Sequence, residues 1–540
     1  MVENTNKEKE ILEGTELNIA TASEKPRKIA RRSTSSSSQK KPIKGVPKSK
    51  KSDLEEADDP EVRQKRLRPS SRRPNPVRRR NSTNRSPASQ SKEANTSDGE
   101  AAVTTKVKSK YPPLTDEDRV ISIPQLELLD RDQLLDLAQL NSAQADYISK
   151  DELISRLVKI HGDRGGEIVT NGVLDVASNG YGFLRHGELE HSPTDVYVSE
   201  SQIRRFALRT GDLIAGQIRS PKNGEKYYGL LKVVEVNSKK PEAARLRPSF
   251  DKLTALFPEE RFDLEMSGKS LAPRLLNLIA PIGKGQRGLI VSPPKAGKTI
   301  LLHQIADALT ENYPEVQIFA ALIGERPEEV TDWKRTVKGA TVYASTFDEP
   351  VEEHTRVAEI VLARAKRLVE EGSDVVILLD SITRLARAYN LATPSSGRTL
   401  SGGMDPIALY PPKNFFGAAR NTEEQGTLTI IATCLVDTGS RMDDVIYEEF
   451  KGTGNMEVHL KRELAEKRIY PAIDIPSSST RRDDRLFDEA EYKSIVTMRR
   501  MIGLLADRSS DTAEVTQIIV DRMSKTKNNE EFMASLNDKN

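Results

Sequence analysis

The segment Ser292–Leu302 reads SPPKAGKTILL and carries residue types that bind nucleotide phosphates. In a phosphate-binding loop of the form G-x-x-x-x-G-K-[ST], glycines allow close approach of the backbone, the lysine reaches the β- and γ-phosphates, and the hydroxyl contributes to a Mg²⁺ site. Gly297, Lys298 and Thr299 fit this form, and the small Ser292 replaces the first glycine. The segment therefore predicts a nucleoside triphosphate site.

Two apolar segments elsewhere in the chain end in acidic residues that could complete this site. Asp380 ends VVILLD, and Glu325 and Arg326 follow QIFAALIG. Because the carboxyl ends of parallel strands meet at one edge of a sheet, we expect Asp380 to lie beside the phosphates and to hold Mg²⁺ through water. Glu325 could orient and deprotonate the attacking water. Since ERPEEV is also typical of a helix start, a helix-capping acid is the alternative for Glu325.

The elements that must position these residues alternate between strand and helix from Pro281 onward. Apolar runs of strand length, such as GLIVS and LTIIATCLV, are separated by helical segments such as TILLHQIADAL and HTRVAEIVLARAKRLVEE. This alternation predicts an α/β domain, in which crossover helices cover a parallel sheet. The phosphate loop would then lie between a strand at 288–291 and a helix N-terminus, where anions bind favourably.

Residues 172–237 show a different pattern of short alternating strands with Asn-Gly and Gly-Asp turns. The pattern predicts a five-stranded antiparallel barrel of the OB type. Aromatic and cationic residues are interleaved along it: Tyr181, Phe183, Tyr197, Tyr227, Arg185, Arg204, Arg205 and Lys226. Because bases stack on aromatic rings and phosphates pair with cations, the barrel is predicted to bind single-stranded nucleic acid. The alternative is that some of the rings only fill the barrel.

Charge is divided unevenly along the 540 residues. Residues 1–110 hold 27 Lys and Arg against 15 Asp and Glu, a net charge of +12, and the rest of the chain holds 56 against 66, a net charge of −10. Residues 1–110 also contain no Phe, Trp or Tyr. They cannot bury enough apolar surface to offset the entropy of ordering, so we expect a disordered extension over 1–115. Such a polycation binds nucleic acid non-specifically; a solubilising or spacing tail is the alternative.

Composition and the remaining segments argue against a protein that is disulfide-rich, built on a structural metal site, membrane-spanning or secreted. Residues 126–160 carry apolar residues at helical spacing, with Ser149 and Glu152 as a capping box, and predict a small helical hairpin. The single cysteine, Cys434, excludes a disulfide framework, and the six histidines lack metal-site spacing. No apolar run approaches the roughly 20 residues that span a bilayer, and the first residues lack a signal-peptide core. We expect a cytoplasmic protein with no membrane partner.

Several longer motifs together resemble the family of the bacterial transcription termination factor Rho. They lie between about Pro124 and Leu536 and read GYGFLR, DVYVSESQIRRFALRTGD, PIGKGQRGLIVSPPKAGKT, ERPEEVTDW, LLDSITRLARAYN and DTGSRMDDVIYEEFKGTGN. The resemblance implies a homohexameric ring that uses ATP and Mg²⁺ to translocate along single-stranded RNA, unwinds RNA–DNA hybrids, engages the RNA polymerase elongation complex and terminates transcription in the bacterial cytoplasm.

The expected organisation is therefore multidomain. The patterns and the resemblance together give a disordered basic extension at 1–115, a helical subdomain at 120–165, an OB-type RNA-binding barrel at 166–240, a connector at 241–275 and an α/β RecA-like P-loop ATPase domain at 276–540.

The resemblance also implies roles for individual residues. For the nucleotide, the implied contacts are Lys295, Ala296, Gly297, Lys298, Thr299, Ile300 and the adenine-stacking Tyr470, and the implied metal ligands are Thr299 and Asp380. For catalysis, Glu325 is the implied catalytic acid, Arg326 contacts the γ-phosphate and Arg481 is an arginine finger offered to the neighbouring subunit.

For RNA, the resemblance implies a primary, pyrimidine-preferring site in the barrel and two loops in a central channel. The primary site comprises Tyr181, Phe183, Arg185, Tyr197 and Tyr227. The channel loops are Gly397–Asp405 and Gly439–Asp444, with Arg398, Thr399, Ser401 and Arg441 as the implied RNA contacts. Relatives often have lysine at the positions of Arg398 and Arg441; the exchange keeps the attraction for phosphate but changes the geometry of the contact.

Two other readings of these motifs are open. A rotary-ATPase subunit has the same type of core, an N-terminal barrel and a stretch like Tyr470–Asp474, although the GYGF and SGGMD motifs favour an RNA motor. A passive RNA-binding protein could use the nucleotide only for assembly, although Glu325 and Arg481 favour catalysis. An arginine finger supplied by the next subunit would make hydrolysis depend on assembly.

Overall fold

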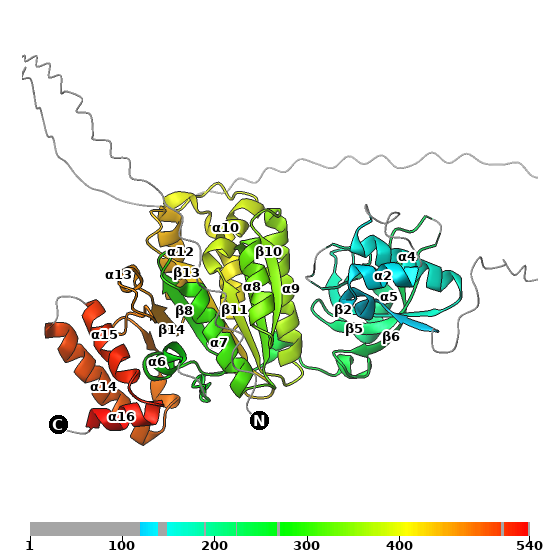
Figure 1. Cartoon of the computed structure of the whole chain (residues 1–540). Helices are drawn as coiled ribbons and strands as arrows, with labels where there is room; N and C mark the ends of the chain where they lie inside the picture. Colours follow the sequence, from blue (N-terminus) through cyan, green and yellow to red (C-terminus); the bar gives the residue numbers. More distant parts are fainter. Residues whose placement is uncertain are drawn as a thin grey trace, which may run out of the picture. The chain divides into compact units, whose positions relative to one another are not determined.

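The computed structural model describes residues 119–138, 148–187, 189, 191–222, 224–266, 270–508 and 512–537 (Figure 1). The predicted basic extension, 1–115, lies outside these residues. The helical subdomain comprises α1 (Ile123–Leu128), α2 (Arg131–Ala138) and α4 (Lys150–Asp163). Ser149 caps α4, because its hydroxyl accepts a hydrogen bond from the backbone N–H of Glu152 at 3.2 Å. The helices α2 and α4 thus correspond to the two helical stretches expected from the apolar spacing.

The next element is a β-barrel of the OB type, as the alternating pattern predicted. Its strands are β2 (Glu167–Val176), β3 (Gly182–Arg185), β4 (Val196–Val198), β5 (Leu213–Arg219) and β6 (Tyr228–Val236), with α5 (Glu200–Phe206) after β4. The strand order is β1-β2-β3-β4-β6-β5, where β1 is Val120–Ser122, and pairing of β2 with β5 closes the barrel. The prediction of a wholly antiparallel barrel was wrong for one pair: β4 and β6 are parallel, because α5 and β5 lie between them in the chain. Alternate strand residues such as Leu174, Leu184 and Ile214 are fully buried in its core.

The α/β domain is built on a seven-stranded sheet with the order β10-β9-β11-β13-β8-β14-β15. The strands are β8 (Arg287–Ser292), β9 (Gln317–Glu325), β10 (Ala340–Thr346), β11 (Val375–Asp380), β13 (Leu428–Leu435), β14 (Met456–His459) and β15 (Ser479–Thr480). All neighbouring strands are parallel except the short edge strand β15. The parallel α/β sheet predicted from the alternation of strands and helices is therefore confirmed. A separate two-stranded ladder joins β7 (Ala255–Leu256) to β12 (Asn421–Thr422).

Helices cover both faces of this sheet, and each face has its own apolar core. Alternate residues of β11 show the division: Val376 and Leu378 join one core, and Ile377 and Leu379 join the other. The first core packs against α6 (Leu271–Ile279), α7 (Lys298–Asn312), α8 (Pro327–Thr336), α14 (Glu489–Arg508), α15 (Thr512–Met523) and α16 (Asn529–Asn537). The second packs against α9 (Val351–Val369), α10 (Ile382–Ala392), α11 (Tyr410–Gly417) and α12 (Arg441–Lys451).

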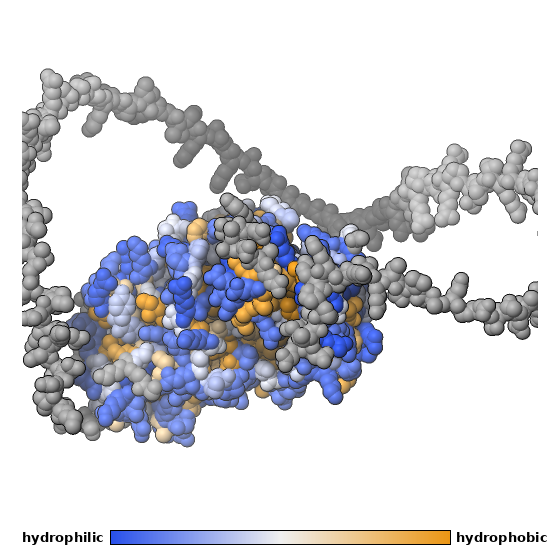
Figure 2. Space-filling view, turned by 45° about the vertical axis from the view of Figure 1, so that its right-hand side comes forward, coloured by the Kyte–Doolittle hydropathy of each residue, from blue (hydrophilic) through white to orange (hydrophobic). Residues whose placement is uncertain are grey.

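Figure 1 shows α7, α8 and α9 beside the sheet and groups α14, α15 and α16 near α6. The short helix α13 (Arg462–Glu466) follows β14. On the face seen in Figure 2, hydrophilic side chains surround smaller hydrophobic areas. Among the helices that the structure describes, none is long and apolar enough to cross a membrane.

Charged residues of the barrel pair with residues at the end of α9. The Arg247 guanidinium donates to both carboxylate oxygens of Asp212, in the barrel, and lies 3.4 Å from Glu370. Arg209, also in the barrel, donates to Glu370 at 3.0 Å. Asp212 and Glu370 are almost fully buried, so these hydrogen-bonded ion pairs are the means by which their charges are compensated.

Candidate functional site

The predicted phosphate loop connects the end of β8 at Ser292 to the first turn of α7. Lys298 is the first residue of that helix, and Gly297 is its N-cap with a φ of 94°. Glycine adopts this left-handed conformation without the steric penalty that a side chain brings, which explains why glycine occupies the bend. Lys298 and Thr299 therefore stand at a helix N-terminus, where unpaired N–H groups and the helix dipole attract anions.

The Lys298 ammonium joins the ends of two further strands. Its Nζ lies 2.7 Å from both carboxylate oxygens of Asp380, at the end of β11, and 3.0 Å from Glu325 Oε1, at the end of β9. The two carboxylates are buried, with exposed fractions of 3% for Glu325 and 1% for Asp380, and the Lys298 side chain is partly buried, at 16%. The residues that the motifs predicted to meet at the carboxyl edge of the sheet are thus brought together there.

Two residues that the sequence analysis did not identify hold these carboxylates. The Thr433 hydroxyl, on β13, donates to Asp380 at 2.7 Å, and the Arg384 guanidinium, on α10, lies 3.3 Å from Glu325. Neither pairing has a local sequence signal, because each partner belongs to a different strand or helix. Glu325 itself ends a strand, and the N-cap of α8 is Arg326. Glu325 therefore does not occupy the helix-capping position that was its alternative.

The electrostatics of this cluster favour a proton-accepting role for Glu325. Burial raises the pKa of Glu325, and the negative charge of Asp380 raises that pKa further. Burial by itself would lower the pKa of Lys298, but Asp380 and Glu325 outweigh it and the pKa is raised, which keeps the ammonium charged. A carboxylate whose pKa is shifted toward neutrality is suited to general-base catalysis.

The oxygens of Thr299 and Asp380 fit a Mg²⁺ ion. Hydroxyl and carboxylate oxygens are the ligands that Mg²⁺ prefers, and in nucleotide sites the ion binds one or two protein oxygens and completes its octahedron with phosphate and water. Within the described ranges, no group of three or more His, Cys, Asp or Glu residues could hold a metal. A nucleotide-dependent Mg²⁺ site is therefore the kind of metal site that these residues can form.

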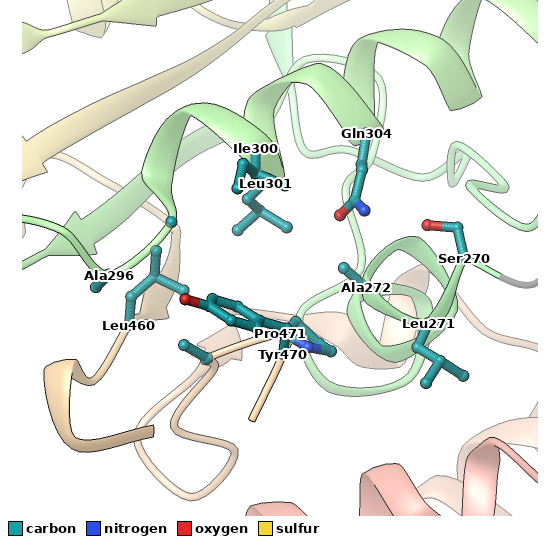
Figure 3. Close-up of a pocket in the computed structure, with 12 residues that line it drawn as sticks. Ser270, Leu271, Ala272, Ala296, Ile300, Leu301, Gln304, Leu460, Tyr470 and Pro471 are labelled. Atoms are coloured by element: carbon teal, nitrogen blue, oxygen red, sulfur yellow. The ribbon is translucent and has the colours of Figure 1, made fainter. Parts of the chain in front are cut away.

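A cavity of about 320 Å³ lies next to the phosphate loop. Its walls are mostly apolar and include Ala296, Ile300, Leu460, Tyr470 and Pro471. Figure 3 shows the Tyr470 ring below Ile300 and Leu301, with Gln304 and Ser270 at the opposite side of the cavity. A flat aromatic side chain in an apolar slot beside a phosphate loop provides a stacking surface for a nucleotide base.

Arg326 and Arg481 lie at opposite ends of the sheet. Arg326 follows β9 at the carboxyl edge and its side chain is 63% exposed. Arg481 follows β15 at the amino end of β14, where its backbone N–H donates to the Asn455 carbonyl at 2.8 Å and Asn455 in turn bonds to Arg287, the first residue of β8. The six residues of β8 separate this edge from the phosphate loop by about 17 Å, at about 3.3 Å per residue. The Arg481 side chain therefore cannot reach the phosphate loop of its own chain.

The two loops predicted to line a channel pack against each other. Arg398, Thr399 and Ser401 are exposed in the first loop, and Arg441 is exposed as the first residue of α12 in the second. A Cβ atom at Gly402 would lie 2.4 Å from the Met442 backbone nitrogen, so glycine is required for this close approach.

The second loop is also tied to α10, which begins directly after Asp380. Asp443 is buried and accepts two hydrogen bonds from the Arg387 guanidinium, at 2.8 and 2.6 Å, and one from Thr438 at 2.6 Å. The loop that carries Arg441 is therefore connected to the nucleotide cluster through a single helix.

Four aromatic rings form a cluster on the barrel. The Phe183 ring centroid lies 5.8 Å from Tyr181, 6.1 Å from Tyr197 and 4.9 Å from Tyr227. Tyr197 is 40% exposed, and the Leu184 side chain next to Phe183 is the one that enters the barrel core. The rings are therefore gathered at the outside of the barrel, where bases can stack on them.

A cavity of about 260 Å³ adjoins this aromatic cluster, and its lining includes Tyr197, Arg219, Glu225, Lys226 and Tyr227. The Lys226 ammonium lies 5.2 Å from the centroid of the Tyr227 ring. Arg219 and Glu225 were not identified from the sequence. They form a bidentate pair in the lining of the cavity, with the second hydrogen bond at 2.9 Å.

Arg185 lies differently from the other residues predicted to contact RNA. Only 5% of its side chain is exposed, and its guanidinium pairs with Asp195 and lies 3.4 Å from Asp175. The same guanidinium lies 5.1 Å from the centroid of the Phe183 ring. Its charge is thus compensated inside the protein, and its observed contacts support the Phe183 ring rather than present a cation to phosphate.

The barrel and the α/β domain each match a known protein family. Residues 170–242 match the family model for the Rho termination factor RNA-binding domain, and residues 273–480 match that for the ATP synthase alpha/beta family nucleotide-binding domain. The chain is 53% identical to transcription termination factor Rho of Allochromatium vinosum over 392 residues, which cover 72% of this chain and 92% of the relative. It is 52% identical to the Rho of Pseudomonas aeruginosa, covering 76% and 97%, and 51% identical to that of Bacillus subtilis, covering 77% and 96%.

Proposed function

This chain belongs to the Rho family of transcription termination factors, and from that premise we propose that it is an RNA-stimulated ATPase that moves along single-stranded RNA and terminates transcription. The observation that carries the proposal is the buried cluster of Lys298, Asp380 and Glu325 in a chain whose barrel holds an exposed group of aromatic rings. The first feature supports phosphoryl transfer, and the second supports the binding of bases.

In the proposed reaction, Lys298 leaves the two carboxylates and contacts the β- and γ-phosphates of ATP. Mg²⁺, when bound, would neutralise phosphate charge, with Thr299 and Asp380 as its protein ligands. Glu325 would orient the attacking water and accept its proton, while Arg326 would contact the γ-phosphate and Tyr470 would stack on the adenine. The remaining proposed nucleotide contacts, Lys295, Ala296, Gly297 and Ile300, line the loop and the adjoining cavity.

The position of Arg481 supports hydrolysis between subunits. Because about 17 Å of β8 separates this residue from its own phosphate loop, it can complete only the site of a neighbouring copy. An arginine finger is worth roughly 10³–10⁵ in rate. We therefore propose a ring of identical subunits, six by resemblance to the family, in which hydrolysis shifts the loops carrying Arg398 and Arg441 along RNA.

The barrel would hold RNA first, through Tyr181, Phe183, Tyr197 and Tyr227, with Arg185 as the support of Phe183. Unwinding of RNA–DNA hybrids, engagement of the RNA polymerase elongation complex and a place in the bacterial cytoplasm complete the proposal. A rotary-ATPase role is not favoured, because residues 170–242 match an RNA-binding domain.

The decisive experiment measures ATP hydrolysis by the full chain with and without poly(C). RNA-stimulated turnover that disappears in Glu325→Gln, with poly(C) affinity retained, would support the proposal. Nucleotide-dependent assembly without any RNA-stimulated hydrolysis would contradict it and favour an RNA-binding protein that uses ATP only to assemble.

A further inference from the structure

Asn455, in the segment GTGN before β14, connects the phosphate-loop strand to the backbone of Arg481. Its side-chain Oδ1 accepts a hydrogen bond from Gln286 Nε2 at 2.7 Å and another from the Arg287 backbone N–H at 2.8 Å. Its backbone N–H donates to the Arg287 carbonyl at 3.0 Å, and its own carbonyl accepts from the Arg481 N–H at 2.8 Å. One residue thus fixes the start of β8 and the residue proposed as the arginine finger.

The residues on either side of Arg481 in the chain, Thr480 and Arg482, also fix the course of its backbone. The Thr480 hydroxyl, directly before Arg481, is buried and donates to the Pro281 carbonyl at 2.8 Å. Arg482, directly after it, has a φ of 57°, which turns the chain away from the sheet. The backbone of Arg481 is therefore anchored on both sides, whereas its side chain is exposed.

Arg287, at the start of β8, lies within electrostatic reach of two other arginines, Arg420 and Arg481. Arg287 donates to the Thr453 and Ala419 carbonyls, both at 3.0 Å, and Arg420 donates to the Ala418 carbonyl at 3.1 Å. Burial lowers the pKa of Arg287, and the charges of Arg420 and Arg481 lower it further. Among the described residues, no carboxylate is paired with any of these three arginines.

We propose that Asn455 is a positioning residue for Arg481: its side chain locks the finger segment to the first residues of β8, so that the guanidinium projects toward the phosphates held by a neighbouring copy. The inference rests on the proposed in-trans role of Arg481. In this arrangement β8 joins two sites: it ends at the phosphate loop of its own subunit, and it begins at Arg287, where Asn455 holds the segment whose arginine completes the neighbouring site.

The first test is the kinetics of Asn455→Ala. Misplacement of a catalytic group by about 1 Å can cost on the order of 100-fold in rate, so we expect the kcat for RNA-stimulated ATP hydrolysis to fall by about 10- to 100-fold. The KM for ATP and the affinity for poly(C) should stay unchanged, because the phosphate loop and the barrel rings are intact. Asn455→Asp keeps both acceptor contacts and should retain most of the activity.

The second test separates a finger defect from a general structural defect by mixing subunits. Lys298→Ala subunits lack a working site but carry a normal finger. In mixed assemblies with Asn455→Ala, each intact site beside a Lys298→Ala neighbour should hydrolyse its bound ATP at the wild-type rate in a single turnover. If the substitution instead damages the nucleotide site of the Asn455→Ala subunit itself, hydrolysis at that site would stay slow in the same mixture.

The control mixture, Arg481→Ala with Lys298→Ala, tests the proposed function separately. Fast single-turnover hydrolysis in the control but not in the Asn455 mixture would overturn only the positioning role. Absence of fast hydrolysis in the control would overturn the in-trans finger and, with it, this inference. If Asn455→Ala does not fold, Thr480→Val removes the second anchor with little change in volume, and its mixtures have the same two outcomes.

Discussion

The Lys298 cluster predicts that removal of one positive charge destabilises the α/β domain as well as abolishing catalysis. In Lys298→Ala, the buried carboxylates of Asp380 and Glu325 would face each other without the ammonium that now lies 2.7–3.0 Å from both. Loss of one partner from a buried ion pair costs about 3–5 kcal/mol. For a domain of this size, about 2–4 °C per kcal/mol corresponds to a drop in Tm of roughly 6–20 °C.

The dependence of this effect on pH has a defined sign. The pKa of Glu325 is already raised in the folded protein, and loss of the lysine raises it more. The loss of stability in Lys298→Ala is therefore fully present above the pKa of Glu325 in the folded variant. It becomes smaller as the pH falls below that pKa and Glu325 takes up a proton. Lys298→Ala/Glu325→Gln removes the repulsion between the carboxylates and should recover part of the loss in Tm at pH 7.

Thermal unfolding of the full-length variants at pH 7 and pH 5 measures both effects, and the poly(C) affinity of the barrel at 25 °C serves as the internal control. ATP turnover should be absent in both variants, whereas RNA binding should be unaffected. A Tm for Lys298→Ala within 2 °C of wild type at both pH values would refute the idea that the lysine neutralises these carboxylates. If Lys298→Ala/Glu325→Gln is no more stable than Lys298→Ala, repulsion between the carboxylates of Asp380 and Glu325 is not the cause of the loss.

Three further predictions concern RNA binding and the barrel. Phe183→Ala should weaken single-stranded RNA binding about tenfold, since stacking contributes about 1–3 kcal/mol per base; an unchanged Kd at matched salt would make Phe183 a packing residue. Burial lowers the pKa of His186 to about 4 from 6.5, so the barrel should be fully stable above pH 6.5 and lose about 3 kcal/mol as the pH falls to 4. Urea midpoints of the barrel that do not change over this range, or change equally in His186→Gln, would contradict that assignment. Deletion of residues 1–110 should weaken RNA binding at low salt and flatten the salt slope by about 0.7 per lost phosphate contact, whereas equal slopes would favour a spacer.

The features predicted from the sequence were those with a local signature. The phosphate loop is contiguous, and the strands that end in Asp380 and Glu325 are apolar runs followed by an acid, so their meeting at one sheet edge follows from the rule for parallel strands. The aromatic cluster could also be predicted from the sequence, because its rings alternate with glycine and cations along the barrel strands.

The features that were missed depend on pairs of residues from distant segments. Nothing near Arg384 or Thr433 indicates that they hold Glu325 and Asp380, since each contact forms only when the sheet and α10 assemble. The resemblance implied an RNA contact for Arg185, but nothing in the sequence indicated that its guanidinium pairs with Asp195 and lies 3.4 Å from Asp175. Sequence spacing shows where a cation is, but not which partner neutralises it.

The separation of Lys298 and Arg481 to opposite ends of β8 has a consequence for the symmetry of assembly. Two copies related by a two-fold axis would present the same surface to each other, whereas a contact that joins a finger to a phosphate loop is heterologous and gives each assembly a direction. An open row of subunits would therefore always have one site without a finger and one finger without a site. In the proposed assembly, closure of the row into a ring would complete that last site, so the number of competent sites would report directly on whether the ring is closed.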